Sequence, residues 1–314
     1  MKTTIVIGGG PAGLIAASKL ADAGVKTTVL EAKARFGGRA ASERQDSFDL
    51  NQGPHALYVG GAAMRELRAL GVDPPGWNPA SVTSSLLIRD GKLRRTLGPR
   101  TLAALGGLLR RVMKRPTGLE GISVAEWLDA ELRSPSGREA AAALVRVLTF
   151  VADHERLSAD VAAGQLRIGL NPGVRYIEGG WQWLADSLAV ETERRGAELK
   201  TRAAVRALER SGDGWSVVTD DAEHEADAVI VAAGQPAAVA KLVGDRVSPP
   251  GPPAEISSLD LGLRRLPRRR HTFALLDQPT YFSRHSHPKK PDGALLTIAS
   301  YAAQPLEALE ASPT

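Results

Sequence analysis

The feature that most constrains this chain is a glycine-rich turn near its amino terminus. Ile5-Val6-Ile7 is a short apolar run, typical of a strand covered on both faces. Residues 8–13 read GGGPAG, and the alanine-rich stretch that follows has helical character up to about Ala23. A second apolar run over 27–30 ends on Glu31. The order of strand, glycine turn, helix, strand and acid predicts a dinucleotide-binding βαβ unit.

Three of these glycines have the spacing G-x-G-x-x-G, and each has a physical role. Gly8 allows the tight turn out of the strand, Gly10 lets the backbone approach a pyrophosphate, and Gly13 lets the helix pack closely on the sheet. The N–H groups at the start of the helix then face the phosphates. At the tip of the second strand, the Glu31 carboxylate can accept both hydroxyls of an adenosine ribose. We therefore predict a pyrophosphate-binding turn made of Gly8, Gly10, Pro11, Ala12 and Gly13.

The residues after Glu31 narrow the choice of cofactor. Residues 31–40, EAKARFGGRA, resemble the E-A-x-x-R-x-G-G-R segment of the FAD-dependent oxidoreductase superfamily that contains flavin amine oxidases, phytoene desaturases and protoporphyrinogen oxidases. The resemblance implies FAD, with Gly38 and Arg39 at the pyrophosphate and Ala32 and Lys33 beside the adenosine. Lys33 stands where amine oxidases often have arginine. Lysine keeps the positive charge but lacks the planar guanidinium group that can make two parallel hydrogen bonds.

Two later segments carry the same resemblance. Gly179-Gly180 followed by a helical pattern resembles the GGM-x-x-L element that leads these flavoproteins back to the cofactor domain. The apolar run 226–234 ends in Ala-Ala-Gly and resembles the strand with which the chain rejoins the parallel sheet. The resemblance implies further cofactor contacts at Val205, beside adenine, and at Ala233.

A Gly-Pro turn places His55 at the tip of a loop. In the resembling families a related element lies along the flavin ring, which makes Gly53, Pro54 and His55 candidate neighbours of that ring. A turn with an exposed histidine is an equally open interpretation. The sequence assigns no catalytic base.

The length of the chain and a stretch rich in proline and glycine predict the domain organisation. A chain of 314 residues suggests two domains, and Asp73-Pro74-Pro75-Gly76 marks a boundary near residue 75. We expect an α/β fold: a Rossmann-like FAD-binding domain of the GR2 type over 1–75 and 176–245, with an inserted α+β substrate domain over 76–175 and 246–314. The substrate domain should hold a hairpin turning on Asp90-Gly91, helices over 101–113, 123–133 and 138–152, and strands over 258–263, 272–276 and 294–301.

Composition excludes several classes of function. The chain has no cysteine, which removes disulfides, thiolate metal sites and the dithiol chemistry of disulfide reductases. His285 and His287 share one face of a candidate strand, but no third ligand accompanies them, so we predict no metal site. With no binding motif and few aromatic residues, nucleic acid is not an expected partner.

Net charge and hydropathy bear on where the protein is located in the cell. The net charge of +5 is spread over 40 basic and 35 acidic residues, and cations cluster at the end of the 101–113 helix. These cations either complement the helix dipole, which we favour, or contact an anionic membrane. We expect no signal peptide, and the sequence contains no apolar run long enough to span a bilayer. We expect a cytoplasmic protein with a small-molecule substrate, and weak peripheral membrane contact as the lesser alternative.

The resemblance implies the activity of an FAD-dependent oxidoreductase. Such an enzyme would pass a hydride to flavin from a C–H bond, either in amine oxidation or in desaturation of an isoprenoid-like substrate. The resembling families continue past the point where this sequence ends, so we expect it to lack their carboxy-terminal flavin-binding segment. Two alternatives stay open: an inactive, truncated dinucleotide-binding module, and an NAD(P)-dependent dehydrogenase, which the segment from Arg35 to Arg39 disfavours.

Overall fold

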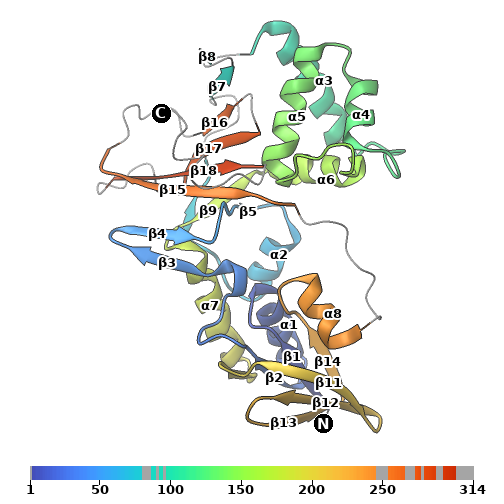
Figure 1. Cartoon of the computed structure of the whole chain (residues 1–314), viewed down its shortest axis with the longest axis vertical. Coiled ribbons are helices and arrows are strands. Elements are labelled where there is room, and N and C mark those ends of the chain that lie inside the picture. Colours follow the sequence, from blue (N-terminus) through green and yellow to red (C-terminus); the bar gives the residue numbers. More distant parts are fainter. Residues whose placement is uncertain are drawn as a thin grey trace. The chain divides into compact units, whose positions relative to one another are not determined.

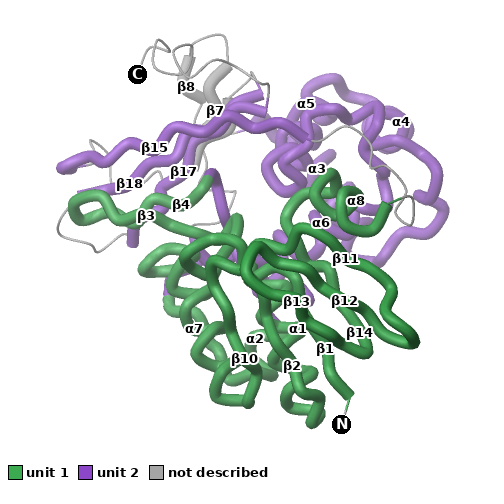
Figure 2. Tube along the Cα trace, turned by 60° about the horizontal axis from the view of Figure 1, so that its bottom comes forward, with its two compact units in different colours: residues 1–52, 65–75, 177–253 green, residues 53–64, 76–176, 254–314 purple. Residues whose placement is uncertain are grey.

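The chain divides into two compact units. The computed structural model describes residues 2–79, 86–89, 92–94, 97–244, 254–265, 273–276, 279–287 and 293–301. Unit 1 comprises Met1–Gln52, Arg65–Pro75 and Ile177–Pro253, and unit 2 comprises Gly53–Met64, Gly76–Tyr176 and Ala254–Thr314 (Figure 2). The units differ from the predicted domains mainly in grouping Gly53–Met64 with unit 2. The assignment of the domains to cofactor and substrate stays a prediction.

A four-stranded parallel sheet forms the centre of unit 1, in the order β10-β2-β1-β14. The strands are β1 (Thr3–Ile7), β2 (Lys26–Leu30), β10 (Glu198–Lys200) and β14 (Ala228–Val231). Helix α1 (Pro11–Asp22) joins β1 to β2, and α7 (Gly180–Arg194) packs beside it (Figure 1). The run 226–234 therefore does return the chain to the parallel sheet, where β14 pairs with β1.

Both faces of β1 are buried, as the sequence predicts. Val6 packs in a cluster with Ala17 of α1 and with Val29. Ile5 and Ile7 point to the other face, into a separate cluster. Alternate residues of one strand thus enter two cores, which explains why the run carries no polar residue.

The remaining elements of unit 1 are mostly short. They are the hairpin β3 (Ser42–Gln45) and β4 (Phe48–Asn51), the 3-10 turn η1 (Gly38–Ala40), the antiparallel sheet of β11 (Val205–Ser211), β12 (Gly214–Thr219) and β13 (Glu223–Ala226), and α8 (Pro236–Val243). Helix α2 (Ala62–Ala69) has residues in both units. Strands β10 and β11 are close in the sequence but belong to different sheets. Between them Arg202 adopts a φ of 55°, which ends the extended run.

Unit 2 contains a six-stranded sheet in the order β15-β18-β17-β16-β7-β8. Its strands are β7 (Leu86–Arg89), β8 (Lys92–Arg94), β15 (Ser257–Leu263), β16 (Phe273–Leu276), β17 (Thr280–Arg284) and β18 (Ala294–Ser300). The antiparallel pairing of β7 with β8 agrees with the predicted hairpin, whose turn residues Asp90 and Gly91 lie outside the described residues. Strand β17 is not among the predicted strands. A small second sheet joins β5 (Leu57–Tyr58), β9 (Val174–Ile177) and β6 (Gly76–Trp77).

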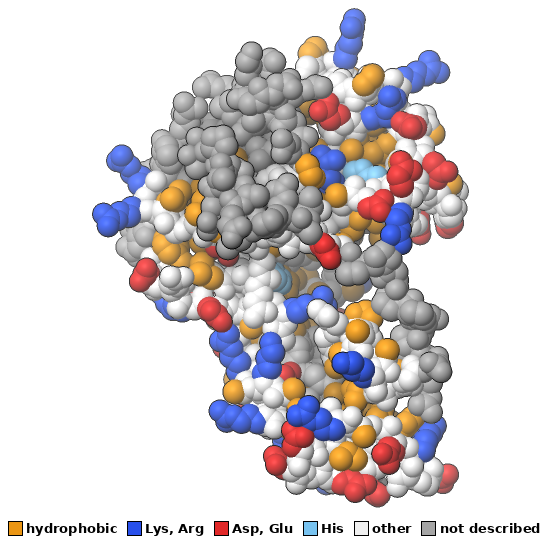
Figure 3. All heavy atoms as spheres, in the orientation of Figure 1, with side chains coloured by type: hydrophobic (Ala, Val, Ile, Leu, Met, Phe, Trp, Pro, Cys, Tyr) orange, Lys and Arg blue, Asp and Glu red, His pale blue; other side chains and the backbone are white. Residues whose placement is uncertain are grey.

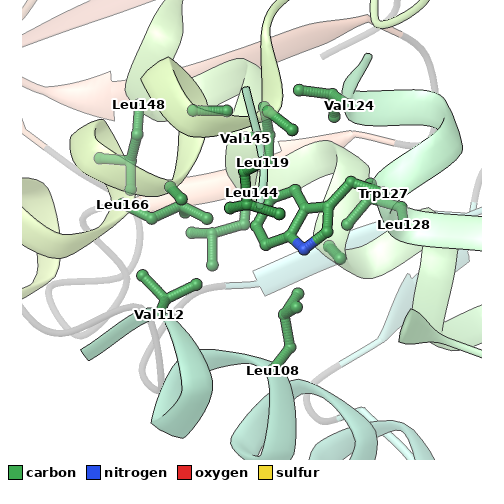
Figure 4. Packing of buried hydrophobic residues seen from close by; sticks show 14 of the residues in the cluster. Leu108, Val112, Leu119, Val124, Trp127, Leu128, Leu144, Val145, Leu148 and Leu166 are labelled. Atoms are coloured by element: carbon green, nitrogen blue, oxygen red, sulfur yellow. The ribbon is translucent and has the colours of Figure 1, made fainter. Parts of the chain in front are cut away.

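Four helices enclose the largest apolar core of unit 2. They are α3 (Pro99–Met113), α4 (Val124–Glu131), α5 (Pro135–Thr149) and α6 (Ala159–Leu170). Leu108, Trp127, Leu144 and Leu166 converge between them (Figure 4). Helix α4 begins with a capping box, in which Ser123 and Glu126 satisfy each other's backbone N–H groups. Helix α6 is absent from the predicted helices, because its small residues give it a weak apolar stripe.

The charged surface shows no segregation on the face drawn in Figure 3, where the described basic and acidic side chains are interspersed. Of the cations at the end of α3, Arg111 lies 2.6 Å from Glu131 in an ion pair. No helix in the described ranges combines the length and apolarity that a membrane span requires.

Two leucines of α3 provide a matched test of the helical core. Leu108 is 1% exposed and Leu102 is 51% exposed. We expect Leu108→Ala to lower the free energy of unfolding by about 2–5 kcal/mol, because it leaves a cavity between the helices. Leu102→Ala should change it by no more than about 0.5 kcal/mol. Urea denaturation followed by circular dichroism measures both, and equal effects would contradict this description of the core.

Candidate functional site

The glycine turn of unit 1 is closed so tightly that two of its glycines are required by the fold itself. Gly8 has a φ of +108°, and a Cβ added there would lie 2.7 Å from the Ala232 carbonyl oxygen. A Cβ on Gly13 would lie 2.0 Å from the carbonyl oxygen of Gly8. Real Cβ atoms do not approach so closely, so the start of α1 can pack against the end of β1 only without side chains.

Gly10 differs from both. Its φ of −77° suits any residue. The nearest protein atom to an added Cβ would be the Gly37 carbonyl oxygen, 3.8 Å away. The fold therefore does not need glycine at this position. The space that a side chain would occupy remains open for an external group.

The start of α1 presents hydrogen-bond donors at the same place, with no partner among the described residues. Gly10 is the N-cap, Pro11 follows it, no side chain caps the helix and its first turn carries no acid. The N–H groups of Ala12 and Gly13 precede the first intrahelical donor, which is Leu14 N–H to Gly10 O. Free donors and the positive end of the helix dipole suit an anion such as a pyrophosphate.

Glu31 holds this turn in place. Its buried carboxylate accepts the Gly9 N–H at Oε2 and the Lys33 N–H at Oε1, both at 2.8 Å. The sequence predicts only a contact to ribose and misses these two bonds. A carboxylate has about four acceptor positions, so two bonds to the backbone leave capacity for ribose hydroxyls.

A second glycine pair lies against the first turn. Gly37 and Gly38 have φ values of +129° and +55°, and the Gly37 N–H donates to Gly9 O at 2.9 Å. The Cβ position of Gly38 is 3.6 Å from the Cα of Gly10. Arg39 follows, exposed and in no ion pair with a described residue. The Arg39 guanidinium is therefore available to an anion bound at the turn.

Two predicted contacts from distant parts of the sequence also lie in this neighbourhood. Ala233 follows β14, and its Cα is 3.2 Å from the Cβ position of Gly8. Val205 shares an apolar cluster with Leu30 and Ala233. Unit 1 thus gathers most of the predicted residues: Gly8, Gly10, Pro11, Ala12, Gly13, Glu31, Ala32, Lys33, Gly38, Arg39, Val205 and Ala233.

The other three predicted residues, Gly53, Pro54 and His55, belong to unit 2. Gly53 has a φ of +87°, so the turn requires glycine there. The His55 Nδ1 lies 2.9 Å from the Gly53 carbonyl oxygen. A carbonyl only accepts, so Nδ1 carries the proton and the lone pair of the neutral ring is on Nε2. The predicted residues therefore form two groups, one in each unit.

Pro54 and His55 line a cavity of about 280 Å³ whose lining residues all belong to unit 2. The cavity is largely apolar and aromatic. It is lined by Pro54, His55, Ala56, Tyr58, Asn78, Pro79, Val147, Leu148, Phe150, Gly169, Leu170, Pro172, Gly173, Val174, Tyr176, Tyr281 and His285. The Tyr58 hydroxyl donates to the Leu148 carbonyl oxygen at 2.6 Å, and burial raises the pKa of Tyr58 to about 12.

Sequence patterns missed the polar wall of this cavity. The His285 ring stacks on Tyr176 with centroids 4.3 Å apart, and its Nε2 lies 2.7 Å from the Ser283 Oγ. Burial, with a smaller contribution from His55, lowers the pKa of His285 to about 3. The prediction of His285 and His287 on one strand face is wrong, because β17 ends at Arg284. The His287 ring instead contacts Trp77, with centroids 5.5 Å apart.

The residues of unit 1 fit an FAD molecule. The open position at Gly10, the free donors of α1 and the exposed Arg39 suit a pyrophosphate, and Glu31 suits a ribose. Their role in binding the cofactor stays a prediction from glycine spacing and family resemblance.

Comparison with known proteins agrees with this description. The model of the family "Flavin containing amine oxidoreductase" matches residues 11–263. An uncharacterized protein of Mycobacterium tuberculosis is 29% identical over 85% of this chain and 60% of its own length. The carotenoid phi-ring synthase of Streptomyces griseus is 29% identical over 72% of this chain and 51% of its own length. The chain thus spans about half to 60% of the length of these relatives.

Solved structures show the same fold. A protein from Pyrococcus furiosus superposes with a TM-score of 0.77 at 22% identity, covering 98% of this chain and 82% of its own. A putrescine oxidase superposes with a TM-score of 0.74 at 19% identity, covering 99% and 78%. These likenesses confirm the α/β flavoprotein fold, and the family match confirms the predicted superfamily and its cofactor, FAD. The chain belongs to the flavin containing amine oxidoreductases.

Proposed function

We propose that this chain is part of an FAD-dependent oxidoreductase that carries out a two-electron oxidation of a small molecule. In this proposal unit 1 holds the adenosine and pyrophosphate of FAD, and the cavity of unit 2 receives the substrate. When bound, FAD would supply the hydride acceptor for oxidation of a C–H bond beside nitrogen or for desaturation. The printed names of two similar proteins support the proposal, a carotenoid phi-ring synthase and a putative flavin-containing monoamine oxidase.

The open position at Gly10 is the main observation in support of FAD binding by unit 1. Gly8 and Gly13 are explained by contacts within the protein, whereas the nearest described atom to an added methyl group at Gly10, outside its chain neighbours, is 3.8 Å away. A glycine that the protein does not need for its own packing supports a ligand that needs close access to the backbone. The N–H groups of Ala12 and Gly13 and the Arg39 guanidinium would bind and orient the phosphates there.

The cavity of unit 2 supports the second part of the proposal, which is that this unit receives the substrate. By family resemblance Gly53, Pro54 and His55 lie along the flavin ring, and two of these residues line the cavity. Apolar walls from α5, α6 and β9 would exclude water from a reacting C–H bond. The substrate would then be oriented mainly by shape.

Two polar groups of the cavity are unsuited to proton transfer near neutral pH. Tyr58 has a pKa of about 12, and its hydroxyl proton is already donated to the Leu148 carbonyl oxygen. His285 has a pKa of about 3. An efficient general acid or base has a pKa near the working pH, so these groups would shape the cavity instead of exchanging protons.

Alanine substitutions at two glycines separate folding from cofactor binding. We expect Gly10→Ala to change the free energy of unfolding of the FAD-free protein by no more than about 1 kcal/mol, because the lower entropy of the unfolded chain is offset by the preference of the N-cap for glycine over alanine. The added methyl group should displace the pyrophosphate and raise the FAD dissociation constant by about ten- to a hundredfold. Gly13→Ala should lower stability by about 1–3 kcal/mol through overpacking. Urea denaturation and FAD titration measure these effects.

The two glycine variants also test each other. If Gly10→Ala destabilised the FAD-free protein as much as Gly13→Ala and left FAD affinity unchanged, then Gly10 would be a structural residue. The cofactor half of the proposal would then be contradicted.

Absorbance tests the proposed chemistry. The purified chain, supplied with FAD, should retain it in equimolar amount and show a flavin spectrum, and a substrate should bleach that spectrum under anaerobic conditions. Protein that stays colourless and takes up no FAD would reject the proposal. Protein that binds FAD but is never bleached, across amines and isoprenoid hydrocarbons, would favour a dinucleotide-binding module without activity.

A further inference from the structure

Helix α7 begins against the β3–β4 hairpin and η1, all within unit 1 (Figure 1). Its N-cap, Gly179, has no side chain, so residues of the hairpin satisfy the first N–H groups of the helix. The Trp181 N–H donates to Asn51 Oδ1 at 2.9 Å. The Gln182 N–H donates to Ser42 Oγ at 3.1 Å. These bonds fix the position from which the Gln182 side chain extends.

The glycine pair at the start of α7 allows this close approach. Gly180 has a φ of +75°, and a Cβ added there would lie 2.6 Å from the Ser42 Oγ and 3.2 Å from the Asp49 Cβ. Gly179 has a φ of +82°, which also favours glycine. The pair is therefore explained by the packing of α7 on the hairpin, and this packing brings Gln182 to the second glycine turn.

The Gln182 amide nitrogen joins α7 to that turn. Nε2 donates to the Phe36 carbonyl oxygen at 3.0 Å and to Asp186 Oδ1 at 2.7 Å. A carbonyl oxygen and a carboxylate only accept, so the nitrogen of the amide, and not its oxygen, must face them. The Oε1 then lies 3.2 Å from the Cβ position of Gly37. The side chain is thus held in one orientation against the turn.

The second glycine turn also contacts the first one. The Gly37 N–H donates to Gly9 O at 2.9 Å. A Cβ added to Gly9 would lie 2.2 Å from Cδ1 of Phe36, so the phenylalanine ring packs directly on Gly9. Residues 36–38 are therefore attached at two places, to Gly9 and to Gln182, and Arg39 follows them directly.

This turn needs support because of its two glycines. Gly37 and Gly38 have φ values of +129° and +55°. Glycine reaches such conformations easily, but it loses more conformational freedom on ordering than any other residue. Without the bond to Gln182 the turn would sample further conformations, and only the fraction with Gly38 and Arg39 in place could bind a pyrophosphate. The apparent affinity falls in proportion to that fraction.

We propose that Gln182 is a positioning residue of the FAD site, which holds residues 36–38 in the arrangement that lets Gly38 and Arg39 bind the pyrophosphate. It acts through the turn, by its hydrogen bond to Phe36, and not by contact with the cofactor. The inference rests on the proposed function in taking Gly38 and Arg39 as pyrophosphate contacts. Neither the glycine spacing nor the family resemblance points to this residue.

Hydrogen exchange of the FAD-free protein tests the link to the turn. Gln182→Met has a side chain of similar length without N–H donors, and α7 keeps its backbone bonds to the hairpin, so the variant should fold. We expect exchange over residues 36–41 to become about two- to tenfold faster, the range for loss of one hydrogen bond, and exchange in β1 and β14 to stay unchanged. Unchanged exchange over 36–41 would overturn the inference.

Two further variants isolate the hydrogen bond from other effects. Gln182→Glu keeps the shape of the side chain but lacks its donors, so it should repeat the effect of Gln182→Met and provides the test if that variant does not fold. Asp186→Asn keeps an Oδ1 acceptor at an exposed position, so it should leave exchange over 36–41 unchanged. Equal acceleration in Asp186→Asn and Gln182→Met would contradict a specific role for Gln182.

Two ligands distinguish a positioning role from a general loss of structure. ADP carries the pyrophosphate, whereas adenosine has the same base and ribose without it. Gln182→Met should raise the ADP dissociation constant by about two- to tenfold and leave that of adenosine unchanged within about twofold. Calorimetric titration measures ADP, and competition with ADP measures adenosine. Equal weakening of both ligands, or no weakening of ADP, would overturn the inference.

The outcome can be separated from that of the proposed function, because exchange is measured without a ligand. Faster exchange over 36–41 in Gln182→Met, in a chain that takes up neither ADP nor FAD, would reject the FAD proposal and leave Gln182 as a residue that orders the turn. Binding of ADP by the unmodified chain, with exchange and ADP affinity unchanged in Gln182→Met, would keep the FAD proposal and reject the positioning role.

Discussion

The close approach between the start of α1 and the end of β1 is the contact on which unit 1 depends. A Cβ on Gly13 would lie 2.0 Å from the Gly8 carbonyl oxygen, so any side chain there would separate the helix from the sheet. The Glu31 carboxylate then ties β2 to the turn through the Gly9 N–H. With the backbone held by its own contacts, the amino end of α1 remains open at Gly10. Closure of the βαβ unit thus leaves the start of α1 accessible at Gly10, where we propose that the pyrophosphate binds.

The sequence predicts this part of the molecule well because its determinants are local. Glycine spacing and the acid at the tip of β2 depend only on residues near one another in the chain. The close contacts of Gly8 and Gly13 agree with the packing roles that the spacing predicts for them, whereas Gly10 makes no such contact with the described residues. The two backbone hydrogen bonds of Glu31 were beyond reach, since they depend on the exact path of the turn.

The cavity of unit 2 could not be predicted in the same way. Tyr176 lies in β9 and His285 directly follows β17, and these two residues, far apart in the sequence, stack on each other only in the folded unit. Apolar lining residues such as Val147 and Leu170 look like any core positions in a helical pattern. The cavity depends on residues that only the fold brings together, and such a meeting has no signature in a linear sequence.

The central claim is that the turn at Gly10 binds the adenosine and pyrophosphate portion of FAD. Calorimetric titration of the FAD-free protein with ADP, which contains only that portion, tests it most directly. We expect ADP to bind in equimolar amount, and no ADP to bind once FAD has been added. Failure of ADP to bind, or undiminished binding of ADP to protein already saturated with FAD, would contradict the claim.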